Sequence, residues 1–272
     1  MILDYGVRAR IRGVWFRVFS RLSYASKTPA RRVFHFFKLL PYRPRFNTKE
    51  IVQCVVGDYL FLTHLESSSA PELVMREYGR LSSSIEEDAV ILDVGAHVGA
   101  FSVMCSKRLN KGLVISFEPN PKIFKLIKIN VYLNGLRNVV PMNIALADYC
   151  GEAELSVMGD PAAGHLSPDL SGVENFEVQV RTIDDFCLER GIDRVALIKI
   201  HAEGSEMDIL KGARNILTDN NLNLAISSAH LRSINIQRQI CEHLLDLGFK
   251  VKIGGQPSHP TLFASKGENI EI

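Results

Sequence analysis

A short buried strand that ends in a glycine turn constrains the fold of this chain more than any other stretch. Residues 89–101 read Ala-Val-Ile-Leu-Asp-Val-Gly-Ala-His-Val-Gly-Ala-Phe. The first half is apolar and rich in β-branched residues, which is typical of a strand buried in a parallel sheet. Gly95 and Gly99 follow, and then a segment with helical spacing. A strand that passes through a glycine turn into a helix is where open α/β sheets bind their ligands.

Strand and helix patterns alternate after this turn and predict the fold class. Apolar runs that predict strands alternate with helical spacing from residue 89 to residue 247. The last two runs, 249–253 and 261–264, predict an antiparallel pair. We therefore expect an α/β fold with a doubly wound, mostly parallel, seven-stranded Rossmann-like sheet and a terminal antiparallel hairpin. The other expected elements are a hairpin at 51–65, a strand pair at 152–158 and 176–182, and helices that include 72–81, 122–134 and 206–217.

Basic residues are concentrated at the start of the chain. Residues 1–50 contain twelve Lys and Arg but only Asp4 and Glu50 as acids, a charge of +10. The rest of the chain therefore carries −8 of the total charge of +2. This asymmetry predicts an acidic domain preceded by a basic arm. We place the arm at residues 1–48 and the domain at 49–272, with its core at 85–265.

The basic arm has the spacing of an amphipathic helix within residues 8–24. The apolar residues on one face of that helix are Ile11, Val14, Trp15, Val18, Phe19 and Leu22. A second apolar cluster, residues 33–40, ends at Pro41. Two interpretations stay open. The arm could make peripheral contact with an anionic membrane surface through residues 8–40, or it could be a helix that packs on the domain or on a second subunit.

The five cysteines are scattered and contain no CxxC pair. We therefore expect neither a disulfide framework nor a metal site. Reduced thiols are typical of a cytoplasmic protein, so membrane contact is expected only as a peripheral interaction at the inner membrane surface. The longest uncharged run, residues 94–106, is well short of the about 18 residues that span a bilayer.

The spacing of the glycines separates two classes of cofactor. Dinucleotide-binding turns read G-x-G-x-x-G, and their middle glycine admits a pyrophosphate. Here Ala-His-Val lies between Gly95 and Gly99, so the middle glycine is missing. Asp93 precedes the turn and suits a positively charged group better than a phosphate. Glu118 ends the next predicted strand, where an acid can accept hydrogen bonds from ribose hydroxyls. An adenosine cofactor without phosphates fits this pattern better than NAD.

Five segments in the same order resemble the FkbM-type S-adenosylmethionine-dependent methyltransferases. The resemblance covers about residues 55–265 and implies a class I methyltransferase domain with S-adenosyl-L-methionine as its cofactor. It also implies O-methylation of a hydroxyl on a glycan, lipid-linked or small-molecule acceptor. No Asn-Pro-Pro-Tyr segment of the amino-methylating kind occurs, which favours oxygen as the acceptor atom. The five segments are residues 93–101, 117–121, 143–148, 180–185 and 198–206.

The resemblance also implies roles for single residues. The turn would hold the methionine end of the cofactor, Glu118 its ribose, and the asparagines its adenosine. The expected cofactor-binding residues are Asp93, Gly95, Ala96, His97, Gly99, Phe101, Glu118, Asn120, Asn143 and Ala145. The expected catalytic residues are His201 and Glu203. Lys199 is expected to form an ion pair with Glu203 or Glu206.

Two positions depart from the family pattern. The fourth-strand motif normally reads Lys-Ile-Asp-x-Glu-Gly, and His201 replaces its Asp. The Glu that commonly follows the fifth strand is replaced by a serine in Ser227-Ser228-Ala229-His230. A histidine can still remove a proton from an acceptor hydroxyl, whereas the loss of two carboxylates makes a bound metal less expected.

These departures leave alternative functions open. One is a catalytically degenerate methyltransferase fold that acts as a binding or scaffold protein. A weaker one is an RNA methyltransferase, because the basic arm contains aromatic residues that could stack on bases. The apolar side of the arm suits packing or lipid better, so we do not expect nucleic acid as the partner. The identity of the acceptor is not readable, because specificity in such folds depends on loops.

Overall fold

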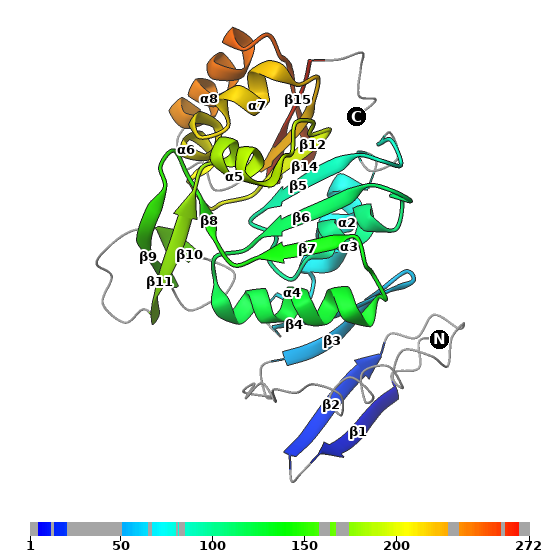
Figure 1. The fold of residues 1–272 in the computed structure, drawn as a ribbon. Helices are drawn as coiled ribbons and strands as arrows, with labels where there is room; N and C mark the ends of the chain where they lie inside the picture. The colour runs from blue at the N-terminus through cyan, green and yellow to red at the C-terminus, as the bar shows by residue number, and fades with distance from the viewer. Residues whose placement is uncertain are drawn as a thin grey trace.

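The computed structural model describes residues 5–11, 14–20, 51–64, 67–79, 81, 85–157, 164–166, 174–227, 234–256 and 259–266. A seven-stranded sheet forms the centre of the domain (Figure 1). Its first five strands in space pair in parallel, and the last two form an antiparallel hairpin. The predicted fold class is therefore confirmed. In spatial order the strands are β7 (Val139–Met142), β6 (Leu113–Phe117), β5 (Val90–Val94), β12 (Leu197–Ile200), β13 (Asn223–Ser227), β15 (His259–Ser265) and β14 (Lys250–Gln256).

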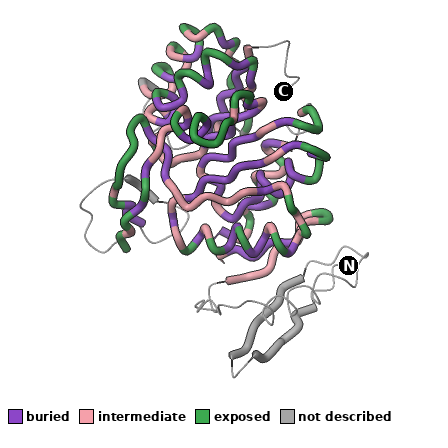
Figure 2. Tube along the Cα trace, in the orientation of Figure 1, coloured by how far each residue is buried: buried purple, intermediate pink, exposed green. Residues whose placement is uncertain are grey.

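The central strands consist mostly of buried residues (Figure 2). Their alternating side chains divide the core into two layers, one on each face of the sheet. On β5, Leu92 and Val94 belong to one apolar cluster and Ile91 belongs to the other, as the two-residue period of a strand requires. The first cluster includes α5 (Ile183–Arg190), α6 (Glu206–Lys211), α7 (Arg214–Asp219) and α8 (Ile234–Asp246), and the second includes α2 (Ala70–Tyr78) and α3 (Ala100–Ser106).

The predicted hairpin at 51–65 is present as β3 (Ile51–Val56) and β4 (Tyr59–His64), and it packs against α4 (Pro121–Leu133). Two asparagines join these elements. Asn130 on α4 accepts a hydrogen bond from the Leu62 N–H at 2.7 Å and donates to the carbonyls of Leu62 and Val98. Asn134 makes the same pair of bonds to the Leu60 backbone. The side-chain amides therefore satisfy an edge strand that would otherwise expose its backbone.

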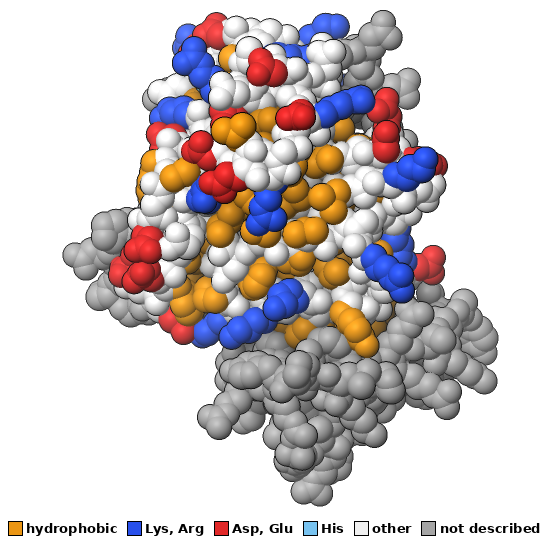
Figure 3. Space-filling model, in the orientation of Figure 1, with side chains coloured by type: hydrophobic (Ala, Val, Ile, Leu, Met, Phe, Trp, Pro, Cys, Tyr) orange, Lys and Arg blue, Asp and Glu red, His pale blue; other side chains and the backbone are white. Residues whose placement is uncertain are grey.

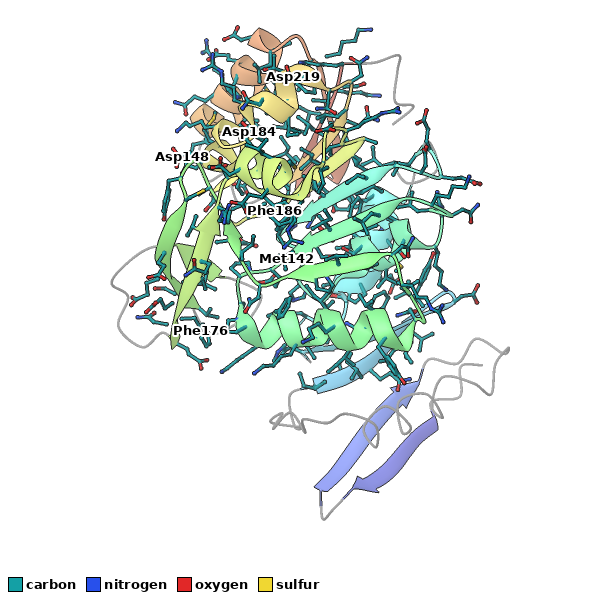
Figure 4. All side chains as sticks on the ribbon, viewed as in Figure 1. Met142, Asp148, Phe176, Asp184, Phe186 and Asp219 are labelled. Carbon is teal, nitrogen blue, oxygen red and sulfur yellow. The ribbon has the colours of Figure 1, made fainter. Side chains whose placement is uncertain are left out.

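A second sheet lies beside the carboxyl ends of β5, β6 and β7 (Figure 1). Its strand order is β10 (Gly164–Leu166), β9 (Gly151–Val157), β11 (Glu174–Arg181) and β8 (Ala145–Leu146). The β9–β11 pair is the predicted antiparallel pair. On this side Lys122 of α4 forms an ion pair with Glu174 and lies over the ring of Phe176, which Figure 4 labels. The second sheet is thus attached to the central domain at the end where ligands bind in this fold class.

The prediction of a helix at residues 8–24 is wrong for the part of this segment that the structure describes. Residues Tyr5–Ile11 and Val14–Ser20 form the strands β1 and β2 of an antiparallel hairpin. The sequence Val-Arg-Ala-Arg-Ile also has a two-residue alternation, and the β-branched and aromatic residues that follow favour strands. The second apolar cluster, residues 33–40, lies outside the described residues.

The expected helix at 206–217 is two helices, α6 and α7, which are separated at Gly212. A Cβ atom at Gly212 would lie 2.0 Å from the Ala147 carbonyl oxygen. The Gly212 carbonyl also accepts a hydrogen bond from the Asp184 N–H at 3.0 Å. Asp184, labelled in Figure 4, then accepts hydrogen bonds from the first backbone N–H groups of α7. This close backbone approach, which only glycine permits, interrupts the helical pattern.

On the face shown in Figure 3, apolar side chains gather over the central strands, and charged side chains surround them. Among the described helices, none combines the length and the apolar character that crossing a membrane requires. The predicted boundary between an arm at 1–48 and a domain at 49–272 stays a prediction.

Candidate active site

The glycine turn that follows β5 has positive φ angles, which glycine adopts more readily than other residues. Gly95, His97 and Gly99 all have positive φ, at 66°, 52° and 83°. A Cβ atom at Gly95 would lie 1.8 Å from the His201 carbonyl oxygen. The turn and the end of β12 are therefore in direct backbone contact, which brings residues about a hundred positions apart into one site. Gly99 then serves as the left-handed N-cap of α3.

Asp93 belongs to a fully buried polar network beneath the turn. Its Oδ1 lies 3.0 Å from Lys199 Nζ, and its Oδ2 accepts a hydrogen bond from Ser102 Oγ at 2.6 Å. Ser102 Oγ also lies 2.6 Å from Ser116 Oγ. The expected pairing of Lys199 with Glu203 or Glu206 is thus wrong, because Lys199 is the direct register partner of Asp93 on the adjacent strand. The contact of Asp93 with the cofactor stays a prediction.

Glu118, immediately after β6, holds the turn from the other side. Its Oε2 accepts a hydrogen bond from the His97 N–H and its Oε1 accepts one from the Asn120 N–H, both at 2.9 Å. Burial raises the pKa of this carboxyl to about 7, although the two N–H donors and Lys199 oppose the rise. Glu118 therefore gains or loses its charge near neutral pH. Each of its oxygens retains a lone pair for a further donor.

The two predicted asparagines organise the rim of the site. Asn120 caps α4, because its side chain accepts hydrogen bonds from the N–H groups of Lys122 and Ile123. Asn143 donates to the carbonyls of Glu118 and Pro119, both at 2.9 Å. It thereby connects the end of β7 to the loop that carries Glu118.

The remaining predicted cofactor residues have different surroundings. The N–H of Ala96 donates to the Phe117 carbonyl at 3.0 Å, which attaches the turn to β6. Ala145 is buried in β8 opposite Val180. Phe101 packs edge-on against Tyr78, with ring centroids 5.5 Å apart, so its ring serves the core between α2 and α3.

The two predicted catalytic residues lie together just after β12. His201 Nε2 is 3.5 Å from Glu203 Oε1, and both side chains are partly exposed. Glu203 has a positive φ of 51°, a conformation that costs a residue with a side chain free energy. The buried carboxylate of Glu206 accepts hydrogen bonds from the N–H groups of Ala202 and Gly204 at 3.0 Å each, and it therefore holds this turn in shape.

The sequence patterns missed Ser102 and Ser116, and they did not predict the partners that Lys199 and Glu206 have in the structure. Their signal was present but indirect. Lys199 and Ser116 each lie in a strand whose other residues are apolar. A polar side chain in such a strand needs a buried partner.

Comparisons with known proteins match the part of the chain that contains this site. The methyltransferase FkbM domain family matches residues 93–251, which begin at Asp93 and include both catalytic candidates. The hexuronic acid methyltransferase AglP of Haloferax volcanii is 27% identical over 150 residues, which cover 55% of this chain and 59% of AglP. The 2-O-methyltransferase NoeI of Sinorhizobium fredii is 24% identical over 170 residues, which cover 56% of this chain and 69% of NoeI.

A solved structure has the same fold. Methyltransferase FkbM from Methylobacillus flagellatus superposes with a TM-score of 0.51 and 18% sequence identity over 72% of this chain. The match spans 51% of the FkbM chain, so this chain corresponds to about half of that protein. The family match extends over more than half of the sequence and contains the glycine turn, Glu118 and the His201–Glu203 pair. The chain therefore belongs to the FkbM methyltransferase domain family, whose cofactor is S-adenosylmethionine.

Proposed function

We propose that this protein transfers the methyl group of S-adenosylmethionine to a hydroxyl oxygen of a sugar or another hydroxyl-bearing small molecule. The observation that carries this proposal is the position of the His201–Glu203 pair, which contacts the glycine turn through the His201 backbone. The names of AglP and NoeI, a hexuronic acid methyltransferase and a 2-O-methyltransferase, support an oxygen on a sugar as the acceptor.

The described residues fit the cofactor. The left-handed backbone at Gly95 and Gly99 lets the turn pack closely against His201 and Ile127 at the strand end, where ligands bind in this fold class. The Glu118 carboxylate is fixed by two backbone donors and can accept ribose hydroxyls on its remaining lone pairs. In this proposal the turn binds the methionine end, Glu118 binds the ribose, and Asn120 and Asn143 hold the loops along the adenosine.

His201 acts as the general base. When bound, S-adenosylmethionine would supply a methyl carbon on a positively charged sulfur; the acceptor oxygen would bond to that carbon, and the sulfur would leave as a neutral thioether. The His201 imidazole would receive the hydroxyl proton, because the ring is partly exposed and lies 3.5 Å from the Glu203 carboxylate. Glu203 stabilises the resulting imidazolium.

Orientation accounts for the rest of the rate enhancement. A displacement between two bound reactants depends mainly on their alignment, and a general base contributes about a hundredfold to ten-thousandfold. Glu206 serves this alignment, because its buried carboxylate holds the turn that brings Glu203 to His201.

The test is a kinetic comparison of His201→Ala and His201→Asp with the wild type. Release of S-adenosylhomocysteine is measured with hexuronic acid glycosides and neutral glycosides as acceptors. We expect His201→Ala to lower kcat about a hundredfold or more with little change in cofactor affinity. His201→Asp restores the acid of the family motif and should retain more activity than the alanine variant. Equal kcat for wild type and His201→Ala would remove His201 from the mechanism.

Cofactor binding by the wild type without transfer to any acceptor would favour the alternative function, a degenerate methyltransferase fold that only binds. A methylated RNA product would instead favour the RNA methyltransferase hypothesis.

A further inference from the structure

The ammonium group of Lys199 lies directly beneath the glycine turn. It donates hydrogen bonds to the Gly95 carbonyl at 2.7 Å and to the Val94 carbonyl at 3.2 Å. It also lies 3.0 Å from Asp93 Oδ1. Lys199 is 3% exposed and Asp93 is fully buried. A lysine is almost never buried this deeply unless it is paired, so these three contacts account for its position.

The strand register creates this arrangement. Lys199, Asp93 and Ser116 are direct neighbours on the adjacent strands β12, β5 and β6. Successive side chains in a strand alternate between faces, and Ser102 of α3 contacts both Asp93 and Ser116. The network therefore lies between the sheet and α3. Its lysine reaches the two carbonyls at the point where β5 becomes the turn.

The bonds of Lys199 link the two halves of the site. The Val94 carbonyl accepts hydrogen bonds from Lys199 Nζ and from the His201 N–H, the latter at 3.0 Å. Because the peptide unit is planar, fixing the carbonyls of Val94 and Gly95 also fixes the direction of the N–H groups that follow them. Lys199 thus sets the orientation of the turn and holds it against the start of the His201 segment.

We propose that Lys199 is a positioning residue for cofactor binding, which acts through its hydrogen bonds to the Val94 and Gly95 carbonyls and not only by neutralising Asp93. The inference rests on the assignment of the turn as the S-adenosylmethionine site in the proposed function. It extends that function by assigning a residue buried beneath the turn to control of cofactor affinity.

The pH dependence of cofactor binding distinguishes this role of Lys199 from simple packing. The charged groups that act on Glu118 are Lys199, which lowers its pKa, and Asp93, which raises it, while the N–H groups of His97 and Asn120 also lower it. Removing the lysine charge leaves Asp93 unpaired and raises the pKa of Glu118 further. The pH at which cofactor binding weakens must then move upward. A residue that only fills space would not move it.

The experiment measures S-adenosylhomocysteine binding by calorimetry across pH for three variants. Lys199→Met removes the ammonium group and keeps an unbranched chain. The double variant Asp93→Asn/Lys199→Met removes both buried charges, so that a folding defect caused by an unpaired Asp93 is avoided. Arg194→Met is the control, because it breaks the exposed ion pair between Arg194 and Glu86, with an N–O distance of 3.1 Å, which is expected to contribute little.

We expect Lys199→Met to weaken binding about tenfold to a hundredfold and to shift the pH profile upward. The double variant should regain thermal stability but still bind weakly, because the carbonyl bonds are not restored. The control should bind like the wild type. Wild-type affinity in the folded double variant would overturn the proposal, since neutralising Asp93 would then be enough for cofactor binding. Wild-type affinity in Lys199→Met would also overturn it.

These results are distinct from a failure of the proposed function. A wild-type protein that binds S-adenosylhomocysteine but transfers no methyl group contradicts the proposed reaction, and the variant series would still support or overturn the role of Lys199. A wild-type protein that does not bind it at all overturns both.

Discussion

At the scale of single residues, Glu118 connects the chemistry of the site to pH. A pKa of about 7 means that a buried carboxyl is half protonated at neutral pH. In the folded protein Glu118 therefore retains its proton up to about pH 7, whereas in the unfolded chain it releases the proton above its ordinary pKa of 4.5. The resulting contribution to stability is complete below that value and is lost as the pH rises through about 7.

Cofactor binding should have the opposite dependence on pH. In the proposed cofactor site, ribose hydroxyls donate to the ionised carboxylate, so we expect the affinity for S-adenosylhomocysteine to fall as the pH is lowered from about 8 to about 6. Binding should release protons in this range, which calorimetry in buffers of different ionisation enthalpy measures. Glu118→Gln should bind weakly at every pH. A pH-independent wild-type affinity would show that the Glu118 charge does not take part.

Gly95 offers a second test at this scale. Gly95→Ala would place a Cβ atom 1.8 Å from the His201 carbonyl oxygen, in addition to the strain of a φ of 66°. Gly135→Ala is a matched control, because Gly135 has a φ of 68° and nothing within 4 Å of an added Cβ. We expect the control to lose about 1–2 kcal/mol of stability. Gly95→Ala should lose more and should abolish cofactor binding, as thermal unfolding and calorimetry will show. Equal losses would mean that the contact between turn and β12 can relax.

At the scale of elements, Asn130 is the joint between β4, α4 and the glycine turn. Its three hydrogen bonds are buried, and one of them reaches the Val98 carbonyl within the turn. Asn130→Ala leaves buried backbone groups without partners, so we expect a loss of about 2–4 kcal/mol in the free energy of unfolding. Asn134→Ala should cost less, because the equivalent bonds of Asn134 are only partly buried and water can replace them. Chemical denaturation of both variants provides the comparison.

The elements also show where sequence periodicity is decisive and where it is not. The buried strands of the central sheet were predicted because apolar runs between turns have few alternatives. The arm was predicted incorrectly because residues 5–20 fit both a helical and a two-residue period, and only pairing with a neighbouring strand decides between them. The β1–β2 hairpin also contradicts the amphipathic helix that was the reason to expect membrane contact. The membrane contact itself stays a prediction.

At the scale of the whole molecule, the site is assembled from segments far apart in sequence. The glycine turn and Glu118 were predictable from local motifs, because each comes directly after a strand that the sequence pattern indicates. The Lys199–Asp93 pair was not, because it depends on the order β12-β5-β6, which spacing alone does not give. The hydrogen bonds of Glu206 were not predicted for a similar reason, since its carboxylate folds back onto the turn that precedes its own helix.

The second sheet gives the molecule a candidate acceptor side. Two residues separate β7 from β8, so this sheet starts at the carboxyl end of the parallel strands, where the candidate site lies (Figure 1). Acceptor specificity in α/β enzymes comes from such additions at the strand ends. In the proposed function, a sugar-sized acceptor would reach His201 from the side of the second sheet.

The most direct measurement of the central claim is mass spectrometry of reactions with S-adenosylmethionine that carries a deuterated methyl group. A panel of hexuronic acid and neutral glycosides is incubated with the wild type, His201→Ala and Glu118→Ala. We predict that the wild type places the labelled methyl group on a hydroxyl oxygen of at least one glycoside, and that both variants do so far more slowly. A label found on nitrogen or carbon, or equal labelling by wild type and both variants, would contradict the account.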